Sequence, residues 1–158
     1  MSQKSQKSRI TRITDFVYDH TRHKDAWQSA SQEPVAGFDS LRGQKYALLT
    51  TYKKSGEPVP SPVWFGLDTD GRFYFTTEEA SPKVTRMRNN PAVRIAPSKQ
   101  NGKPLGPPAE GTARVLPPED AARAEAIIAA NYGRGRTIFD RVTSGLGVAA
   151  VYVEVTPG

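Results

Sequence analysis

The sequence predicts a mainly β (α+β) domain, a six-stranded antiparallel β-barrel with flanking helices. Short segments rich in β-branched and aromatic residues recur along the chain, and turn signals separate the first three of them at hairpin spacing. Helical periodicity is confined to the segments between these runs. The predicted strands are residues 46–52, 59–67, 72–77, 92–96, 109–115 and 148–155.

The first three strands are joined by turns that favour antiparallel pairing. The first turn contains Lys54, Ser55 and Gly56, and the second contains the Asp70-Gly71 pair. Short turns of this composition connect neighbouring antiparallel strands, because parallel strands need a much longer crossover. We therefore expect these strands to pair antiparallel within the barrel.

Two helices interrupt the strands. The first, residues 81–89, begins with a Ser-Pro pair that suits the N-cap and the first helical position, and a proline follows its end. The second, residues 119–132, has apolar residues at helical spacing, acids at its start and a glycine after its end. A further helical turn or two is expected at residues 137–144.

The chain of 158 residues fits one domain of ordinary size. Residues 1–35 are predicted to form an N-terminal tail, partly disordered or weakly helical, and residues 36–158 to form the barrel. No apolar run approaches the ~18 residues of a membrane helix, and the N-terminus lacks the apolar region of a secretory signal. We therefore expect a cytoplasmic protein with no membrane partner.

Composition excludes several kinds of chemistry. The absence of Cys excludes a disulfide scaffold, thiolate-bound metals and a thiol nucleophile. The two histidines, His20 and His23, both lie in the N-terminal segment, so a Ser-His-Asp triad has no base and no third ligand completes a metal site. The formal charge of +6 predicts an anionic partner, which the net charge alone does not identify.

One group of residues suggests an anion site where the third strand meets the first helix. Helix N-termini bind anions because their backbone N–H groups and the helix dipole present positive charge. Lys83 adds a full charge in the first turn, and Arg86 follows at i+3. The hydroxyl groups of Thr76, Thr77 and Ser81 are suited to donate to phosphate oxygens. The alternative interpretation is an ordinary capped surface helix.

The second predicted strand contains an unusual aromatic residue. Trp64 alternates with prolines, which restrict ladder hydrogen bonding to an edge or a bulge. An aromatic ring in that position needs cover, either from a flat ligand or a partner subunit, or from the N-terminal tail. Alternation places Val59, Ser61, Val63, Phe65 and Leu67 on the core face, and Pro60, Pro62, Trp64 and Gly66 on the other.

An ordered set of motifs resembles a known family. The motifs are KYALLTTY (45–52), PSPVWF (60–65), GRFYFTT (71–77), SPKVTRMRNNP (81–91) and EGTA (110–113). Together they resemble the split-barrel superfamily of pyridoxamine 5'-phosphate oxidase, and specifically its deazaflavin (coenzyme F-420)-dependent oxidoreductase branch. The resemblance covers residues 38–115 well, extends weakly to residue 155, and does not include the first 35 residues.

The resemblance implies a split β-barrel of the FMN-binding type, a homodimer, and a flavin-like cofactor in a groove at the dimer interface. It implies that residues 60–65, Phe75 and Thr76 line the ring and ribityl chain, and that Lys83 meets the phosphate. Combined with the anion site, the predicted cofactor-binding residues are Ser61, Pro62, Val63, Trp64, Phe65, Phe75, Thr76, Thr77, Ser81, Lys83 and Arg86.

One departure from the family pattern bears on the cofactor. Relatives that bind FMN often have an Arg-Lys pair after the Ser, whereas this chain has Pro82 in the Arg position. Losing one phosphate contact disfavours FMN. The stretch from Lys83 to Lys103 is basic and contains no acid, which suits the phosphodiester and polyglutamate tail of a deazaflavin coenzyme.

The predicted function is hydride transfer between the reduced deazaflavin coenzyme F-420 and an unsaturated organic small molecule. Because the cofactor supplies the chemistry, no catalytic residue is predicted; Tyr52 and Tyr132 are conceivable proton donors, although tyrosines on such faces commonly belong to the core. The alternatives are an FMN-dependent oxidase or reductase, or a non-enzymatic binding barrel. A single-stranded nucleic-acid platform is disfavoured, because Phe73 and Phe75 share a face expected to be core.

Overall fold

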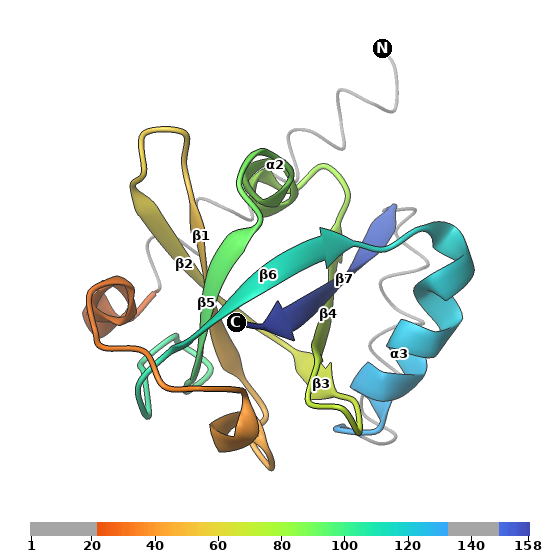
Figure 1. Cartoon of the computed structure of the whole chain (residues 1–158), viewed down its shortest axis with the longest axis horizontal. Helices are drawn as coiled ribbons and strands as arrows, with labels where there is room; N and C mark the ends of the chain where they lie inside the picture. Colours follow the sequence, from red (N-terminus) through yellow and green to blue (C-terminus); the bar gives the residue numbers. More distant parts are fainter. Residues whose placement is uncertain (1–21, 133–148) are drawn as a thin grey trace.

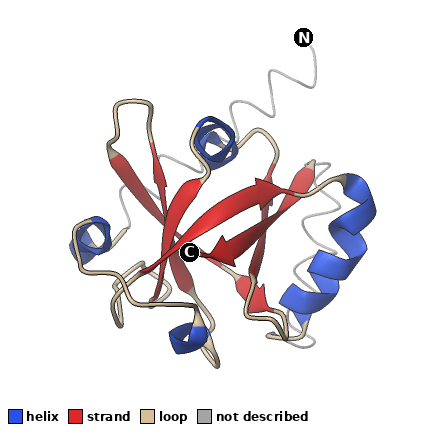
Figure 2. Ribbon diagram, viewed as in Figure 1, coloured by secondary structure: helices blue, strands red, loops and turns tan. Residues whose placement is uncertain are grey.

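The structure of the chain is a computed structural model that describes residues 22–132 and 149–158. One antiparallel sheet of seven strands curls into a half-open barrel with helices around it (Figure 1; Figure 2). This confirms the predicted fold class. With η marking a 3₁₀ helix, the elements are η1 (Lys24–Ala30), η2 (Asp39–Leu41), β1 (Ala47–Tyr52), β2 (Pro58–Val63), β3 (Phe65–Leu67), β4 (Phe73–Glu78), α2 (Pro82–Asn89), β5 (Ala92–Pro97), β6 (Ala109–Val115), η3 (Pro118–Asp120), α3 (Ala121–Ala129) and β7 (Ala150–Pro157).

The strand order closes the sheet on itself. It runs β2-β1-β5-β6-β7-β4-β3, so β2 and β3 lie at opposite edges although only Trp64 separates them in the sequence. Consecutive Cα atoms are about 3.8 Å apart, so the two edges must meet at this residue. The prediction of a single strand over residues 59–67 is therefore wrong, and the sheet has seven strands where six were predicted, because the two halves pair with different neighbours, β1 and β4.

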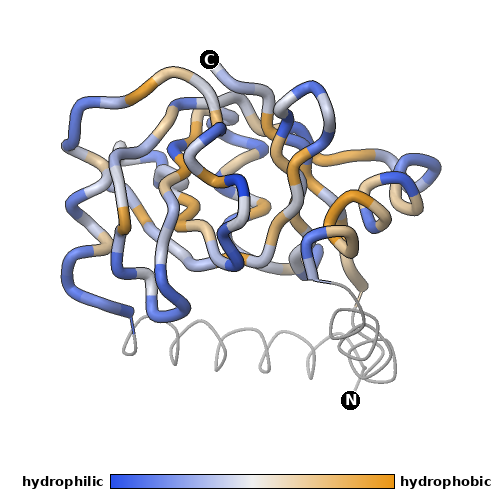
Figure 3. The backbone as a smooth tube through the Cα atoms, turned by 90° about the horizontal axis from the view of Figure 1, so that it is seen from below, coloured by the Kyte–Doolittle hydropathy of each residue, from blue (hydrophilic) through white to orange (hydrophobic). Residues whose placement is uncertain are grey.

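The barrel interior is packed with aromatic rings. Phe65, Phe73 and Phe75 are almost completely buried, and the rings of Phe65 and Phe73 stack with centroids 5.0 Å apart. Phe38 packs edge-on against Phe73 at 6.0 Å. The expectation that Phe73 and Phe75 are core is confirmed. In Figure 3 the hydrophobic stretches lie mainly in the interior of the molecule and the hydrophilic stretches mainly at its periphery.

Helix α3 covers the outer face of β3, β4 and β7 (Figure 1). Tyr74 alternates with the core phenylalanines of β4, so its side chain lies under α3 with Ala124 and Ile128. The helix approaches β3 so closely that a Cβ on Gly66 would lie 2.3 Å from the carbonyl oxygen of Ile127. The predicted helix over residues 119–132 is shorter in the structure: η3 forms its beginning, and just beyond its end the side chains of Asn131 and Tyr132 bind the backbone of Phe65 in β3.

The described part of the N-terminal segment packs against the barrel. Ala26 of η1 is buried against Leu48 and Ala96, and Val35 forms a bridge with Ala109. Arg94 donates hydrogen bonds to two carbonyl oxygens of the segment. Residues 22–35 thus contact the sheet. The division of the chain into a tail and a barrel after residue 35 stays a prediction. The helical turns expected at residues 137–144 lie outside the described residues.

Only one of the two histidines lies within the residues that the structure describes. His23 accepts a hydrogen bond from the backbone N–H of Asp25 at the start of η1, and His20 lies outside the described residues. Residues 22–132 and 149–158 contain no cluster of three or more His, Cys, Asp or Glu arranged to hold a metal. Within the same residues, no helix is both long enough and apolar enough to span a bilayer.

Candidate cofactor-binding site

Three of the predicted site residues, Ser61, Lys83 and Arg86, come together at the end of the barrel where α2 crosses between β1 and β6 (Figure 1). Strand β4 leads into α2 through a short turn, in which Ser81 N–H donates to Glu78 O and Val84 N–H donates to Ser81 O. These two bonds use backbone donors that the sequence analysis assigned to an anion. Lys83 in the first turn therefore becomes the principal candidate for contact with a phosphate.

Two cations of α2 reach over the β1–β2 pair. Lys83 Nζ lies 3.1 Å from Ser61 Oγ, and Arg86 Nε lies 2.7 Å from Thr51 Oγ1. The register pairs Leu49 with Ser61, so Thr51 and Ser61 are diagonal neighbours on one face of the sheet. The structure thus brings Ser61, Lys83 and Arg86 together as predicted site residues and adds Thr51, which the sequence analysis did not select.

Ser81 occupies the N-cap position with extended backbone (φ −64°, ψ 138°), and its side chain makes no capping hydrogen bond within the described helix. The residue is buried, at the base of the turn that carries Lys83. Pro82 takes the first helical position, as predicted. A cation in the first turn of a helix is disfavoured by the helix dipole, and an anion bound beside it would offset that cost.

The threonines of β4 point to different sides of the sheet. Thr76 donates its hydroxyl proton to Val151 O, 2.9 Å away on β7. Alternation places Thr77 on the opposite face from Thr76, together with Phe75. The structure therefore commits the Thr76 hydroxyl to a neighbouring strand, and Thr77 is the threonine that shares the face of the barrel interior.

The stretch proposed to line a ring is partly core. The side chains of Val63, Phe65 and Phe75 all belong to the main hydrophobic cluster, and Pro62 and Trp64 are half-buried. Because the side chains of Val63, Phe65 and Phe75 are in the core, only their backbone atoms can contact a ligand. The Trp64 ring stacks on the Tyr132 ring, with centroids 5.0 Å apart and an interplanar angle of 21°. Tyr132 thus provides cover that the sequence analysis expected from a ligand, a partner or the N-terminal tail.

Neither tyrosine considered as a proton donor is poised for that role. The Tyr132 hydroxyl donates its proton to Lys45 O at 2.8 Å and accepts a hydrogen bond from Phe65 N–H. Tyr52 neighbours Thr51 in β1, so its side chain lies on the other face of the sheet. Burial raises the pKa of Tyr52, and the nearby Arg94 guanidinium acts against that rise.

The basic stretch from Lys83 to Lys103 does not form one surface. Helix α2 precedes β5, whereas Lys99 and Lys103 lie in the loop that follows β5. A six-residue strand separates its ends by roughly 17–20 Å. Arg94, inside β5, pairs with Glu110 at 3.0 Å. The match of this stretch to one polyanionic tail stays a prediction, and the tertiary structure places its members towards both ends of a strand.

A groove of about 770 Å³ lies on the other side of α2, towards β6 and β7. Its lining is mainly apolar, with one cation and one carboxylate among the residues that line it. Volumes of roughly 300–1,000 Å³ are typical of sites for small organic molecules. Among the residues that line the groove are Met87 and Arg88 of α2, Leu116, and Val151 and Tyr152 of β7.

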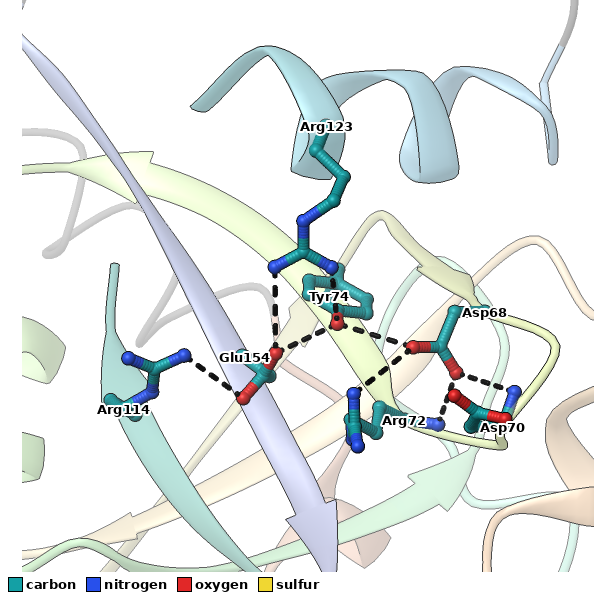
Figure 4. Close-up of polar contacts among 7 residues, drawn as sticks. All are labelled: Asp68, Asp70, Arg72, Tyr74, Arg114, Arg123 and Glu154. Atoms are coloured by element: carbon teal, nitrogen blue, oxygen red, sulfur yellow. Dashed lines mark hydrogen bonds and ion pairs between the residues drawn. The ribbon is translucent and has the colours of Figure 1, made fainter. Parts of the chain in front are cut away.

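A second polar cluster lies outside the barrel, under α3 (Figure 4). The Tyr74 hydroxyl lies 2.7 Å from Glu154 Oε2 and 3.2 Å from Asp68 Oδ2, and Arg123 of α3 donates to the same hydroxyl. Arg114 completes the cluster at 3.4 Å from Glu154 Oε1. Burial and the bond to Glu154 raise the pKa of Tyr74. The cluster ties α3 to the sheet and was not predicted from the sequence.

The architecture defines the chain as a half-open antiparallel barrel with a crossing helix at one end. A family model described as pyridoxamine 5'-phosphate oxidase matches residues 36–153, so the chain belongs to that family. No curated protein matches the chain closely enough in sequence to count as a relative. The predicted superfamily is thus confirmed.

Solved structures share the fold at low identity. A conserved hypothetical protein of Mycobacterium tuberculosis is 19% identical with a TM-score of 0.55, over 75% of this chain and 76% of that one. A heme storage protein of Vibrio cholerae is 14% identical with a TM-score of 0.55, over 73% and 82%. A FAD-binding protein of Mesorhizobium loti is 15% identical with a TM-score of 0.52, over 75% and 85%. These likenesses support the fold.

Proposed function

We propose that the protein is an oxidoreductase that uses the deazaflavin coenzyme F-420 to transfer a hydride to or from an unsaturated organic small molecule. The observation that carries the proposal is the reach of Lys83 to Ser61, with Pro82 where FMN-binding relatives often have an arginine. The family supports a flavin-type cofactor. When bound, the coenzyme would supply the hydride chemistry, and the protein would supply binding and orientation.

The residues of the chain have distinct roles in this proposal. Lys83 and Arg86 hold an anionic group of the cofactor, and the hydroxyls of Ser61 and Thr51 orient these cations. The bend around Trp64 supports the ring. The apolar groove beside α2 has a suitable size for the organic substrate and would limit the access of water to it.

We also propose that the functional unit is a homodimer with the cofactor at its interface, as the family resemblance implies. Because Tyr132 of the same chain covers one part of Trp64, this proposal rests on the family and not on an uncovered Trp64. Light scattering at micromolar protein concentration, with the cofactor present, would show twice the chain mass. A monomer under these conditions would contradict the dimer.

Titration with both cofactors tests the cofactor assignment. We expect the protein to bind coenzyme F-420 more tightly than FMN, followed by the fluorescence of each cofactor. Equal or reversed affinities would contradict the assignment and favour an FMN-dependent enzyme of the same fold. Binding of either cofactor without reduction of any unsaturated substrate would instead support a non-enzymatic binding barrel.

A further inference from the structure

The bend between β2 and β3 leaves backbone groups that need partners. Phe65 is opposite Phe75 in the β3–β4 pair, yet its N–H donates to Tyr132 Oη at 2.7 Å. Its carbonyl oxygen accepts from Asn131 Nδ2 at 3.1 Å. Both backbone groups of Phe65 therefore point away from β4, towards the end of α3. Two side chains occupy the place that a neighbouring strand would take at this edge.

The same two side chains also bind the segment that leads into β1. Asn131 Nδ2 donates to Gln44 O at 3.0 Å, and the Tyr132 hydroxyl donates to Lys45 O at 2.8 Å. Lys45 Nζ in turn bonds to Asn131 O and lies 5.6 Å from the centre of the Tyr132 ring. The pair thus bridges the seam of the barrel, between the entry to β1 and the edge of β3.

The Tyr132 ring adds a contact at the bend itself. It stacks on Trp64, the one residue between the two edge strands. Close packing of α3 on Gly66, where a Cβ would not fit, fixes the distance between the helix and β3. Backbone hydrogen bonds, ring stacking and helix packing all constrain the three residues from Trp64 to Gly66, so Tyr132 controls the local geometry through two independent contacts.

We propose that Tyr132 is a positioning residue of the cofactor site, which holds the bend at Trp64 and Phe65 in the shape that accepts a planar flavin-type ring. This inference rests on the proposed function. Tyr132 acts through the bend and not on the reacting atoms. If the Tyr132 hydroxyl is removed, the bend samples conformations that do not bind the cofactor. The apparent affinity for the cofactor then falls because only the fraction of molecules in the binding conformation can bind it.

Tyr74 offers a matched control. Its hydroxyl also helps to hold α3, through Arg123 and Glu154, but it contacts neither Trp64 nor Phe65 in the described network (Figure 4). Tyr132→Phe and Tyr74→Phe each remove one hydroxyl and keep the ring. If Tyr132 only stabilised the fold, the folded Tyr132→Phe and Tyr74→Phe variants would bind the cofactor with equal affinity.

The experiment compares wild type, Tyr132→Phe and Tyr74→Phe in three measurements. These are hydrogen exchange of the Phe65 amide, urea unfolding, and fluorescence titration with coenzyme F-420 and with FMN. We expect Tyr132→Phe alone to speed Phe65 exchange selectively and to weaken binding of the preferred cofactor about fivefold to tenfold, the equivalent of one lost hydrogen bond. Tyr74→Phe should lower stability and leave affinity within twofold, roughly the error expected of independent sites.

Equal affinities in wild type and Tyr132→Phe, or equal losses in both variants, would overturn the inference while leaving the proposed function intact. Failure of wild type to bind either cofactor would overturn the proposed function and the positioning role together. If Tyr132→Phe does not fold, Asn131→Ala provides the same test from the carbonyl side of Phe65, with the same expected direction of both effects.

Discussion

The protein gathers cations in two places that differ in what the cations contact. At the α2 end of the barrel, Lys83 and Arg86 reach hydroxyl groups of β1 and β2. Under α3, three arginines, from the turn before β4, from β6 and from α3, surround the carboxylates of Asp68 and Glu154, and a buried tyrosine hydroxyl lies between them (Figure 4). The hydroxyls of Thr51 and Ser61 orient the two cations of α2, and under α3 the arginines face carboxylates.

This difference suggests what each cluster does. Carboxylate and guanidinium groups that are half-buried together mostly fix geometry, because their Coulomb attraction offsets the cost of removing them from water. In the α2 cluster, the Ser61 hydroxyl positions the ammonium group of Lys83 at the place where the proposed function puts the anionic group of the cofactor. The proposed function gives ligand binding to the α2 cluster, and the ion pairs under α3 give that cluster a role in stability; three changes test this division.

The largest effect is expected where α3 meets β3. Gly66→Ala would place a Cβ 2.3 Å from the backbone oxygen of Ile127, so the helix must move away from the sheet. Overpacking of a rigid contact costs about 3 kcal/mol, measured as a lower free energy of unfolding in urea. As a control, Gly71→Ala changes a turn glycine with no neighbour within 4 Å of the new Cβ, and its cost comes from its positive φ alone. Similar unfolding curves for Gly66→Ala and wild type would contradict the close packing.

The second effect concerns the α2 cluster and appears in binding. Lys83→Ala should weaken cofactor affinity roughly 10- to 100-fold, because a charge-assisted hydrogen bond is worth ~1.5–3 kcal/mol. Unfolding without cofactor should change little, since the helix dipole disfavours a lysine in the first turn. Lys83→Arg should keep part of the affinity. Fluorescence titration at several salt concentrations measures all of these.

Arg88→Ala is the matched control for Lys83. It removes a cation from the same helix, but on the side that lines the groove, so cofactor affinity should stay near that of wild type. Rising salt should weaken the wild type more than Lys83→Ala. If Lys83→Ala binds the cofactor normally, the phosphate is held elsewhere and Arg86 becomes the stronger candidate.

The smallest effect is the pH dependence of the α3 cluster. The pKa of Tyr74 is raised above its ordinary value of 10.0, first by burial and then by the bond to Glu154. A raised pKa in the folded state means that its contribution to stability is present below pH 10 and is lost as the pH rises further. Wild type should therefore lose stability faster than Tyr74→Phe above about pH 10, in urea unfolding at a series of pH values. Parallel pH profiles would show that Tyr74 does not titrate in this way.

The sequence by itself determined where most strands lie and which family the chain belongs to. Strand alternation, the Asp70-Gly71 turn and the Ser81-Pro82 start of α2 are local signals, and the structure reproduces them within a few residues. The burial of Phe73 and Phe75 follows from the same alternation. These features could be predicted because they depend on neighbours in the chain.

The tertiary structure alone decided how the site is assembled. The prolines beside Trp64 indicated an edge or a bulge but not a break in the strand, because the break exists only where two edges of one sheet must meet. The same holds for Tyr132, whose partner Phe65 is 67 positions away, and for Thr51, which meets Arg86 across 35 positions. The basic residues from Lys83 to Lys103 show the converse: they are close in sequence, but β5 separates those in α2 from those in the following loop. A rigid strand separates neighbours in the chain, and sheet closure joins residues that are distant in it, so contacts of this kind follow only from the complete fold.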